Sequence, residues 1–301
     1  MTRKAEVGAG VADVDLSGKT VLVTGSTSGI GRETALALGR LGARLFVHGR
    51  DREQGENVVT ELRDLGADAE LFIADFASLD AVRDLASNVD DVCDTLDVLV
   101  NNAGGYFSSA RLTDDGFEYT IGVNHLAPFL LTNLLLPNLR DAPDGRVVTV
   151  SSEAHRGSRV DFGSFQTVAG YSGWRAYGQS KLANVLFAAE LAEREGELTS
   201  NSLHPGVVPG SGFTRTLPGP IRTGISALSA IPNPFTDSVV DGAETQTYLA
   251  ASPEVAGVTG RYFDDCEERT PSRAARDETT QRRLWERSAE LVGLVETDTS
   301  D

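Results

Sequence analysis

The chain has 301 residues, of which 40% are hydrophobic, so it can bury one large core. Its net charge of −17 would repel nucleic acid, which excludes a nucleic-acid partner from our expectations. No stretch approaches the roughly 20 apolar residues of a membrane span, and the first residues lack the apolar segment of a secretory signal. We therefore expect a soluble, cytoplasmic protein.

The reactive side chains give little support to metal or disulfide chemistry. The two cysteines and four histidines are far apart in the sequence and show no metal-ligand spacing. The chain is also poor in lysine, with Lys4, Lys19 and Lys181 as its only three. An acidic, lysine-poor surface suits a protein kept soluble at high salt, and an ordinary acidic enzyme explains the same composition.

Short apolar runs alternate with helix-length segments through the first half of the chain. The predicted strands are 20–24, 44–48, 69–73, 96–100 and 146–150, with helices at 29–41, 51–65, 78–92 and 114–137. Little polar alternation within the strands indicates parallel strands covered on both faces. With further strands at 201–204 and 260–264, the pattern predicts a single α/β domain with a Rossmann-type, doubly wound parallel sheet between two helix layers. We place this domain at 14–295, between disordered tails at 1–13 and 296–301.

A glycine-rich segment, TGSTSGIG, joins the first strand to the first helix. Glycines allow backbone N–H groups to approach a pyrophosphate, and a helix start adds partial positive charge. The spacing is GxxxGxG, and the first βα turn is where such sheets bind dinucleotides. The predicted cofactor contacts are Gly25, Ser26, Thr27, Ser28, Gly29, Ile30 and Gly31. A tight turn without a ligand is the alternative.

The end of the second strand bears on the choice of cofactor. An acidic residue there would bind the ribose 2′-hydroxyl of NAD, whereas arginine suits the 2′-phosphate of NADP. Gly49 stands where the acid would be, and Arg50 follows it. This favours NADP(H) over NAD(H). Alternatively, Arg50 only opens the next helix beside Asp51.

Tyr177 and Lys181 form the candidate reaction centre. They lie four residues apart at the start of a predicted helix, 175–195, so their side chains share a face. An ammonium beside a phenol favours phenolate, so we expect the pKa of Tyr177 to be lowered toward the range of a general acid/base. Ser152, after the fifth strand, would add a hydrogen bond to a substrate oxygen. Tyr and Lys at this spacing also occur on solvated helix faces.

Taken together, these motifs resemble the short-chain dehydrogenase/reductase family over about 14–295. TGSTSGIG, Asn101-Asn102-Ala103-Gly104, Ser151-Ser152, YxxxK and His204-Pro205-Gly206 occur in the family's order. The resemblance implies that Ser152 positions the substrate, Tyr177 transfers the proton, and Lys181 lowers its pKa and holds the nicotinamide ribose. Further cofactor contacts implied by it are Asp75, Phe76, Asn102, Ala103, Gly104, Pro205, Gly206 and Val208. Helices 114–137 and 175–195 commonly pair subunits in the family, which allows a homo-oligomer.

Asn124 matches the family asparagine whose main-chain carbonyl holds a relay water. The residue four positions later is Pro128, which has no N–H to bond that carbonyl. The carbonyl of Asn124 would then be free for water. A simple proline kink is the alternative.

Several segments are similar to the retinol dehydrogenase-like branch of the family, notably VNHLAPFLLT, DFASLDAVR and HPGVV. This implies lipophilic aldehydes, ketones or alcohols as small-molecule substrates. One departure is Gly210, where the family usually has a threonine that contacts the carboxamide; Ser211 or Thr214 could replace it. Loop 207–235 is expected to cover the substrate. Tyr106, Phe107, His155 and Trp174 could line the pocket, although packing or surface exposure is the more common role for each of these residue types.

Two functions compete on this sequence. The first is an NADP(H)-preferring oxidoreductase, and the second is a non-catalytic NADP(H)-binding redox sensor of the same fold. The complete set of Ser152, Tyr177 and Lys181 argues for the enzyme, because a sensor needs no proton transfer. An extended nucleotide-sugar epimerase is disfavoured by the GxxxGxG spacing and by the lack of a sizeable C-terminal substrate domain.

Overall fold

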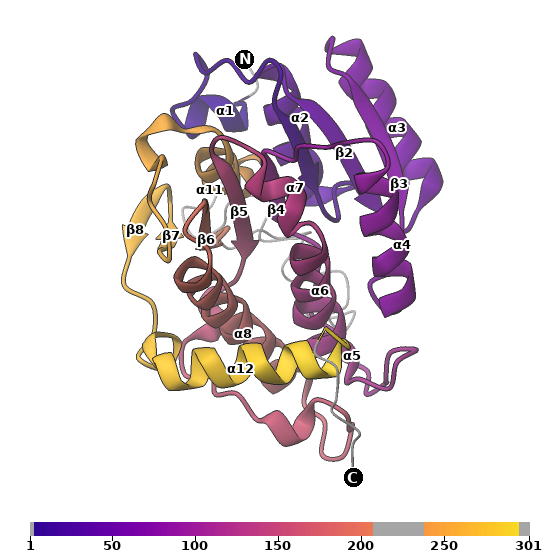
Figure 1. Cartoon of the computed structure of the whole chain (residues 1–301), viewed down its shortest axis with the longest axis vertical. Coiled ribbons are helices and arrows are strands. Elements are labelled where there is room, and N and C mark those ends of the chain that lie inside the picture. Colours follow the sequence, from indigo (N-terminus) through magenta and orange to yellow (C-terminus); the bar gives the residue numbers. More distant parts are fainter. Residues whose placement is uncertain (1–2, 207–237, 295–301) are drawn as a thin grey trace.

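The computed structural model describes residues 3–206 and 238–294, which contain one mixed sheet (Figure 1). Its eight strands follow the order β3-β2-β1-β4-β5-β6-β7-β8. Strands β1 to β7 pair in parallel, and β8 pairs antiparallel with β7. Their bounds are β1 (Thr20–Val23), β2 (Arg44–Gly49), β3 (Ala69–Ile73), β4 (Val98–Asn101), β5 (Gly145–Val150), β6 (Leu198–His204), β7 (Tyr262–Asp264) and β8 (Glu267–Arg269). The predicted doubly wound α/β fold is confirmed.

Helices cover both faces of the sheet. The longer ones are α2 (Gly29–Arg40), α3 (Arg52–Asp64), α4 (Leu79–Asp90), α6 (Ala127–Leu134), α8 (Gly173–Arg194), α11 (Val239–Ala251) and α12 (Glu278–Leu291). Val21 and Leu45 pack in one cluster with α2, α3 and α11, whereas Leu22 and Phe46 pack in another with α4, α6 and α8. Successive strand residues therefore face different helix layers, which explains why the strands read as uninterrupted apolar runs.

Strand β8 was absent from the sequence prediction. Its residues, Glu267–Arg269, are charged and exposed, so no apolar pattern marks it. Asp265 and Cys266 both have positive φ, 53° and 58°, as in the tight turns that join antiparallel strands. The hairpin therefore depends on turn geometry and on pairing with β7.

The prediction of one helix over 114–137 is wrong. The chain instead forms α5 (Tyr119–Ile121), a π-helical turn (Gly122–Leu126), α6, and then α7 (Leu136–Arg140). Within the π turn the N–H of Ala127 donates to the carbonyl of Gly122, five residues earlier. Pro128 cannot donate to the carbonyl of residue 124, so the ordinary helical pattern is interrupted there and the wider turn accommodates it.

Residues 3–13 do not form the disordered tail expected for 1–13. Residues 5–8 form helix α1 (Ala5–Gly8), which packs on α2 and α11. The guanidinium of Arg3 pairs with Asp241 and Glu244 at 2.8 Å each, and Glu6 pairs with Arg40 at 3.1 Å. These partners are far away in sequence, so local composition could not reveal the docking.

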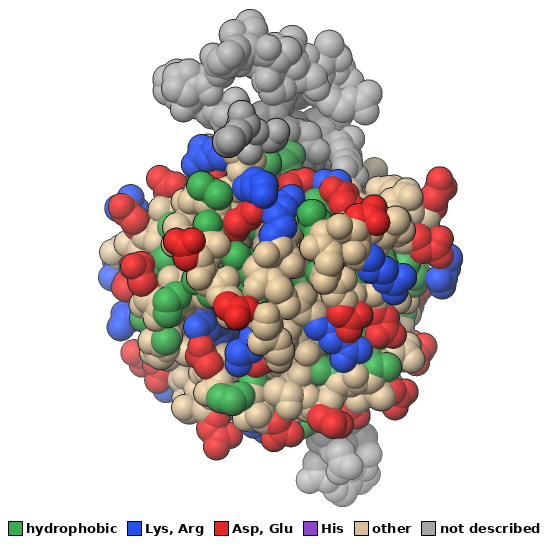
Figure 2. Space-filling view, turned by 90° about the horizontal axis from the view of Figure 1, so that it is seen from above, with side chains coloured by type: hydrophobic (Ala, Val, Ile, Leu, Met, Phe, Trp, Pro, Cys, Tyr) green, Lys and Arg blue, Asp and Glu red, His purple; other side chains and the backbone are tan. Residues whose placement is uncertain are grey.

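Charges of both signs are interspersed on the face shown in Figure 2, with arginine and lysine among the more numerous acidic side chains. Many of them form ion pairs, such as Arg140 with Glu195 at 2.7 Å. Within residues 3–206 and 238–294, the helices are too short or too polar to cross a bilayer.

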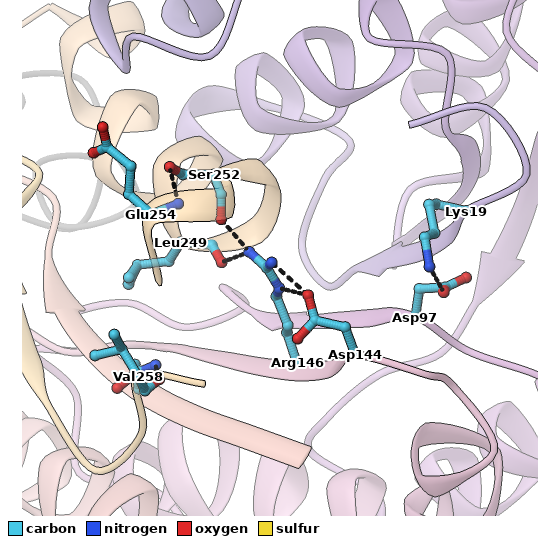
Figure 3. Close-up of polar contacts among 9 residues, drawn as sticks. Lys19, Asp97, Asp144, Arg146, Leu249, Ser252, Glu254 and Val258 are labelled. Carbon is cyan, nitrogen blue, oxygen red and sulfur yellow. Dashed lines mark hydrogen bonds and ion pairs between the residues drawn. The ribbon is translucent and has the colours of Figure 1, made fainter. Parts of the chain in front are cut away.

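Arg146 joins the sheet to the end of α11 (Figure 3). This β5 residue is only 7% exposed, and its Nη1 donates to the carbonyls of Leu249 and Ser252 at 3.2 and 2.8 Å. Its Nη2 contacts a carboxylate oxygen of Asp144 at 2.5 Å. The last carbonyls of a helix have no partner within the helix, so Arg146 satisfies groups that burial would otherwise leave without a donor.

We expect Arg146→Met to lower the free energy of unfolding by about 3 kcal/mol, because buried carbonyls and Asp144 lose their donor. Urea unfolding followed by circular dichroism measures this. The matched control is Arg52→Met, whose exposed guanidinium lies 3.8 Å from Glu56, and we expect a change within about 0.5 kcal/mol. Equal losses in the two variants would contradict the capping role.

Candidate active site

A cavity of about 350 Å³ opens at the carboxyl ends of the strands, where the chain leaves β1 and β4 in opposite directions. Most of the predicted site residues line it: Gly25, Thr27, Ser28, Gly29, Ile30, Gly31, Arg50, Asp75, Phe76, Asn102, Ala103, Gly104, Tyr177, Lys181 and Pro205. Ser26, Asn124, Ser152 and Gly206 are not among its lining residues. Loop 207–235 lies outside the described residues, and with it the predicted Val208, Gly210, Ser211 and Thr214.

The glycine loop is packed directly against the segment after β4. A Cβ on Gly31 would lie 2.3 Å from Nδ2 of Asn102, which leaves no room for a side chain. That Nδ2 donates to the carbonyl of Thr24 at 2.7 Å, so Asn102 braces the loop. Ser26 differs from its prediction: it is fully buried, and its hydroxyl donates to the carbonyl of Val23 at 2.6 Å, so it supports the loop from behind.

His48 is a supporting residue that sequence reasoning missed. Its Nδ1 accepts the N–H of Gly25 at 3.2 Å, while its Nε2 lies 3.2 Å from the carbonyl of Ala74 and donates to it. Burial lowers the pKa of His48 to about 4, so the ring is neutral and can accept at Nδ1. The imidazole thus connects the ends of three strands beneath the glycine loop. No sequence signal marks it, because its partners are set by strand register.

Arg50 lies at the rim of the cavity with its side chain 62% exposed. Its Nη1 is 3.4 Å from a carboxylate oxygen of Asp75 and 3.5 Å from the hydroxyl of Tyr119. Helix α3 begins at Arg52, and the side chain of Asp51 caps it by accepting the N–H of Gln54. Arg50 therefore precedes the helix and its cap, and it contacts Asp75 across the cavity edge.

Tyr177 and Lys181 lie one turn apart on α8, both buried and both lining the cavity. Nζ of Lys181 donates to the carbonyl of Val150 at 3.0 Å and lies 5.8 Å from the centroid of the Tyr177 ring. Burial lowers the pKa of Lys181 to about 8. The predicted facing of these two residues onto one site therefore matches the geometry.

The expected lowering of the Tyr177 pKa is wrong for this structure. Burial raises the pKa of Tyr177, and a hydrogen bond with the Ser152 side chain opposes that rise only in part. The ammonium of Lys181 is too far from the ring, and too engaged with Val150, to reverse the cost of desolvating a phenolate. At neutral pH the phenol keeps its proton and can donate it.

Ser152 lies beside the phenol although it is not part of the cavity lining. Its side chain hydrogen-bonds Tyr177, and its Oγ also accepts the N–H of Ala154 at 3.3 Å. In this way Ser152 caps the short 3-10 turn Glu153–His155. The hydroxyl is consequently held next to the group that carries the proton.

Asn124 serves the site through its side chain in a way the sequence did not indicate. Its Oδ1 accepts the N–H of Gly105, and its Nδ2 donates to the carbonyl of Gly105 and to Oγ of Ser180, each at 2.9 Å. The fully buried amide therefore ties the loop after β4 to α8. The water-binding role of its main-chain carbonyl stays a prediction.

Helix α12 covers part of the two helices expected to pair subunits. It crosses α8 (Figure 1) and brings Trp285 against Phe129 and Phe187, with ring centroids 5.0 and 5.9 Å apart. Oγ of Ser288 is 2.9 Å from Nε2 of His125. The faces of α6 and α8 that contact α12 are thus buried within the same chain.

Comparison with known proteins identifies this arrangement. A family model described as short chain dehydrogenase matches residues 19–218. The chain belongs to the short-chain dehydrogenase family. Human retinol dehydrogenase 14 is 41% identical to it over 93% of this chain and 88% of that protein. The likeness to retinol dehydrogenases is confirmed, and family membership makes the chain an oxidoreductase.

Two solved structures extend the likeness of this short-chain dehydrogenase to three dimensions. An uncharacterised protein from Mycobacterium paratuberculosis is 32% identical, with a TM-score of 0.74 and coverage of 97% of this chain and 98% of that one. RhlG of Pseudomonas aeruginosa in its active-site complex with NADP is 28% identical, with a TM-score of 0.67 and coverage of 83% and 95%.

The burial of Lys181 predicts a conflict between stability and activity in the short-chain dehydrogenase. Its folded pKa of about 8 lies below the usual 10.5, so the charged form destabilises the fold at pH below 8. We expect Lys181→Met to raise the free energy of unfolding at pH 7 by on the order of 2–3 kcal/mol, while turnover falls. The destabilisation caused by burying the ammonium should vanish as pH rises from about 8 to 10.5. The difference in free energy of unfolding between Lys181→Met and the wild type should therefore shrink over that pH range.

Urea unfolding at pH 7 and pH 9.5 measures both effects. Lys4→Met is the control, because it removes a lysine whose side chain is 56% exposed. A Lys181→Met protein less stable than wild type at pH 7 would refute the account.

Proposed function

We propose that this short-chain dehydrogenase transfers a hydride between NADP(H) and a lipophilic carbonyl or alcohol, with Tyr177 as general acid/base. The observation that carries the proposal is that Tyr177 and Lys181 line the same cavity as the glycine loop, with the Ser152 side chain hydrogen-bonded to Tyr177. Phosphate-binding backbone and proton-transfer groups thus belong to one continuous site.

The residues of the cavity fit a dinucleotide. Gly31 lies at the start of α2 without space for a side chain, so backbone at the positive helix end can approach a pyrophosphate closely. When bound, the nicotinamide supplies or accepts the hydride. Glycine-loop backbone groups would hold the phosphates, and Lys181 would hold a ribose hydroxyl from within the cavity.

The protein's own groups handle the proton. Because burial keeps the Tyr177 phenol neutral, it can donate its proton to a carbonyl oxygen during reduction and recover one during oxidation. Ser152 hydrogen-bonds the same phenol, so its hydroxyl can orient the substrate oxygen toward the proton. The Lys181 ammonium then favours the phenolate that remains.

The preference for NADP(H) rests on Arg50. Its exposed guanidinium lies beyond the end of β2 at the cavity rim, beside Asp75, where a 2′-phosphate could accept from it. The NADP complex of RhlG, which shares the fold, supports the same choice.

Aromatic side chains around the phenol support a lipophilic substrate. Ring centroids of Tyr106 and Trp174 lie 6.1 and 6.4 Å from that of Tyr177. Trp174 is 60% exposed, which is high for so large an apolar side chain next to a reactive group. The names of the retinol dehydrogenase relatives agree with such a substrate.

Tyr177→Phe tests the chemistry. We expect the turnover of NADPH with a panel of aldehydes and ketones to fall by at least about 10²-fold, since the proton donor is lost. NADPH binding, followed by its fluorescence, should stay within about twofold of wild type. Near-normal turnover in this variant would refute the mechanism. Tight NADPH binding by the wild type without turnover of any carbonyl would favour the redox sensor.

Arg50→Ala tests the cofactor preference. Losing a charge-assisted bond to the 2′-phosphate should raise the Kd for NADPH about tenfold or more and leave that for NADH nearly unchanged. Arg52→Ala removes a guanidinium two residues later that lies 3.8 Å from Glu56, so it is the matched control. Equal weakening of both cofactors by Arg50→Ala would count against a 2′-phosphate contact.

A further inference from the structure

We propose that His155 is a positioning residue that sets the place of Ser152 relative to Tyr177. This inference rests on the proposed function and deepens it. It assigns the positioning of the Ser152 hydroxyl to a residue other than Ser152, Tyr177 and Lys181. His155 is fully buried and does not line the cavity, so it has no direct access to substrate or cofactor there.

The imidazole holds the main chain of Ser152. Its Nδ1 donates to the Ser152 carbonyl at 2.7 Å, and the backbone N–H of His155 donates to the same carbonyl at 3.0 Å. On the other side of the ring, Nε2 accepts the N–H of Ser272 at 3.1 Å. A donor at Nδ1 and an acceptor at Nε2 define one neutral tautomer, and burial lowers the pKa of His155, which keeps the ring neutral.

The same short turn is attached to the C-terminal part of the chain at two further points. The hydroxyl of Tyr262, on β7, donates to Oε1 of Glu153 at 3.1 Å. Nη2 of Arg156 donates to the carbonyl of Thr270 at 3.0 Å. Of these three side chains, His155 is the one that hydrogen-bonds the main chain of Ser152 itself.

The turn also packs against the backbone of α8 next to the reactive phenol. A Cβ on Gly178, the residue after Tyr177, would lie 2.9 Å from the carbonyl oxygen of Ala154 and 2.3 Å from Oγ of Ser158. Because Gly178 has no side chain, the turn lies directly against the backbone of α8. A movement of the turn would therefore move Ser152 relative to Tyr177. His155 therefore acts on the hydrogen bond between Ser152 and Tyr177.

Two conservative variants separate this role from simple support of the fold. In His155→Asn the side-chain amide replaces Nδ1 and can still donate to the Ser152 carbonyl, but the contact with Ser272 is lost. In His155→Gln the longer side chain can accept from Ser272 in place of Nε2, but its contact with Ser152 is lost. If His155 positions Ser152, catalysis requires the contact with the Ser152 carbonyl. If His155 only supports the fold, the contact with Ser272 matters as much as the contact with Ser152.

The experiment measures kcat for a carbonyl that the wild type reduces, the Kd for NADPH and the thermal midpoint of each variant. We expect His155→Asn to keep kcat within about threefold and His155→Gln to lose about tenfold or more, with NADPH affinity unchanged in both. Loss of kcat in a folded His155→Asn protein equal to that in His155→Gln would overturn the proposal. So would normal kcat in His155→Gln.

A double-mutant cycle with Ser152→Ala shows whether His155 acts through Ser152. If it does, His155→Gln should cost no more than about twofold in the Ser152→Ala background. The same loss of kcat in both backgrounds would overturn the proposal. If His155→Asn folds and His155→Gln does not, the cycle is run with His155→Asn and His155→Leu, and the same outcome would overturn the proposal. A Tyr177→Phe protein that retains turnover would instead refute the proposed function, and the two failures are thus distinguishable.

Discussion

The junction between α8 and the end of β5 determines the geometry of the site. The carbonyl of Val150 accepts from Nζ of Lys181 and from Nδ2 of Asn184, each at 3.0 Å. The hydroxyl of Ser151 donates to the main-chain carbonyl of Lys181 at 2.7 Å. These bonds place the helix that carries Tyr177 against the strand that leads into Ser152. Their relative position is therefore a property of this buried junction.

That junction has an energetic cost that bears on function. Lys181 is the buried ammonium of the site, and a group taken out of water in its charged form destabilises the fold. A hydrogen bond to one carbonyl compensates in part. An apolar residue at the same position would be buried at a lower cost in free energy. A role of the charge in the chemistry of Tyr177 explains why a lysine is buried there.

Neutral histidines perform the supporting work on both sides of the cavity. His48 joins the glycine loop to Ala74, the residue after β3, and His155 joins the Ser152 turn to Ser272. In each ring one nitrogen donates to a carbonyl and the other accepts an N–H, which only the neutral form can do. Burial lowers the pKa of both rings and so maintains that form. The glycine loop and the Ser152 turn are thus each held in place by a buried, neutral histidine.

What the sequence by itself determined is local. Apolar runs and helical periods predicted the strands and most helices, the glycine loop followed β1, and a spacing of four placed Tyr177 and Lys181 on one face, because each signal lies within a few residues. Pro128 revealed a missing N–H but not the π turn that accommodates it.

Tertiary structure alone decided the remaining features. The docking of α1 through Arg3, the inward turn of Ser26, the roles of His48 and His155, and the raised pKa of Tyr177 all depend on burial or on partners distant in sequence. Desolvation and strand register arise only when the chain is packed, and no pattern of neighbouring residues encodes them directly.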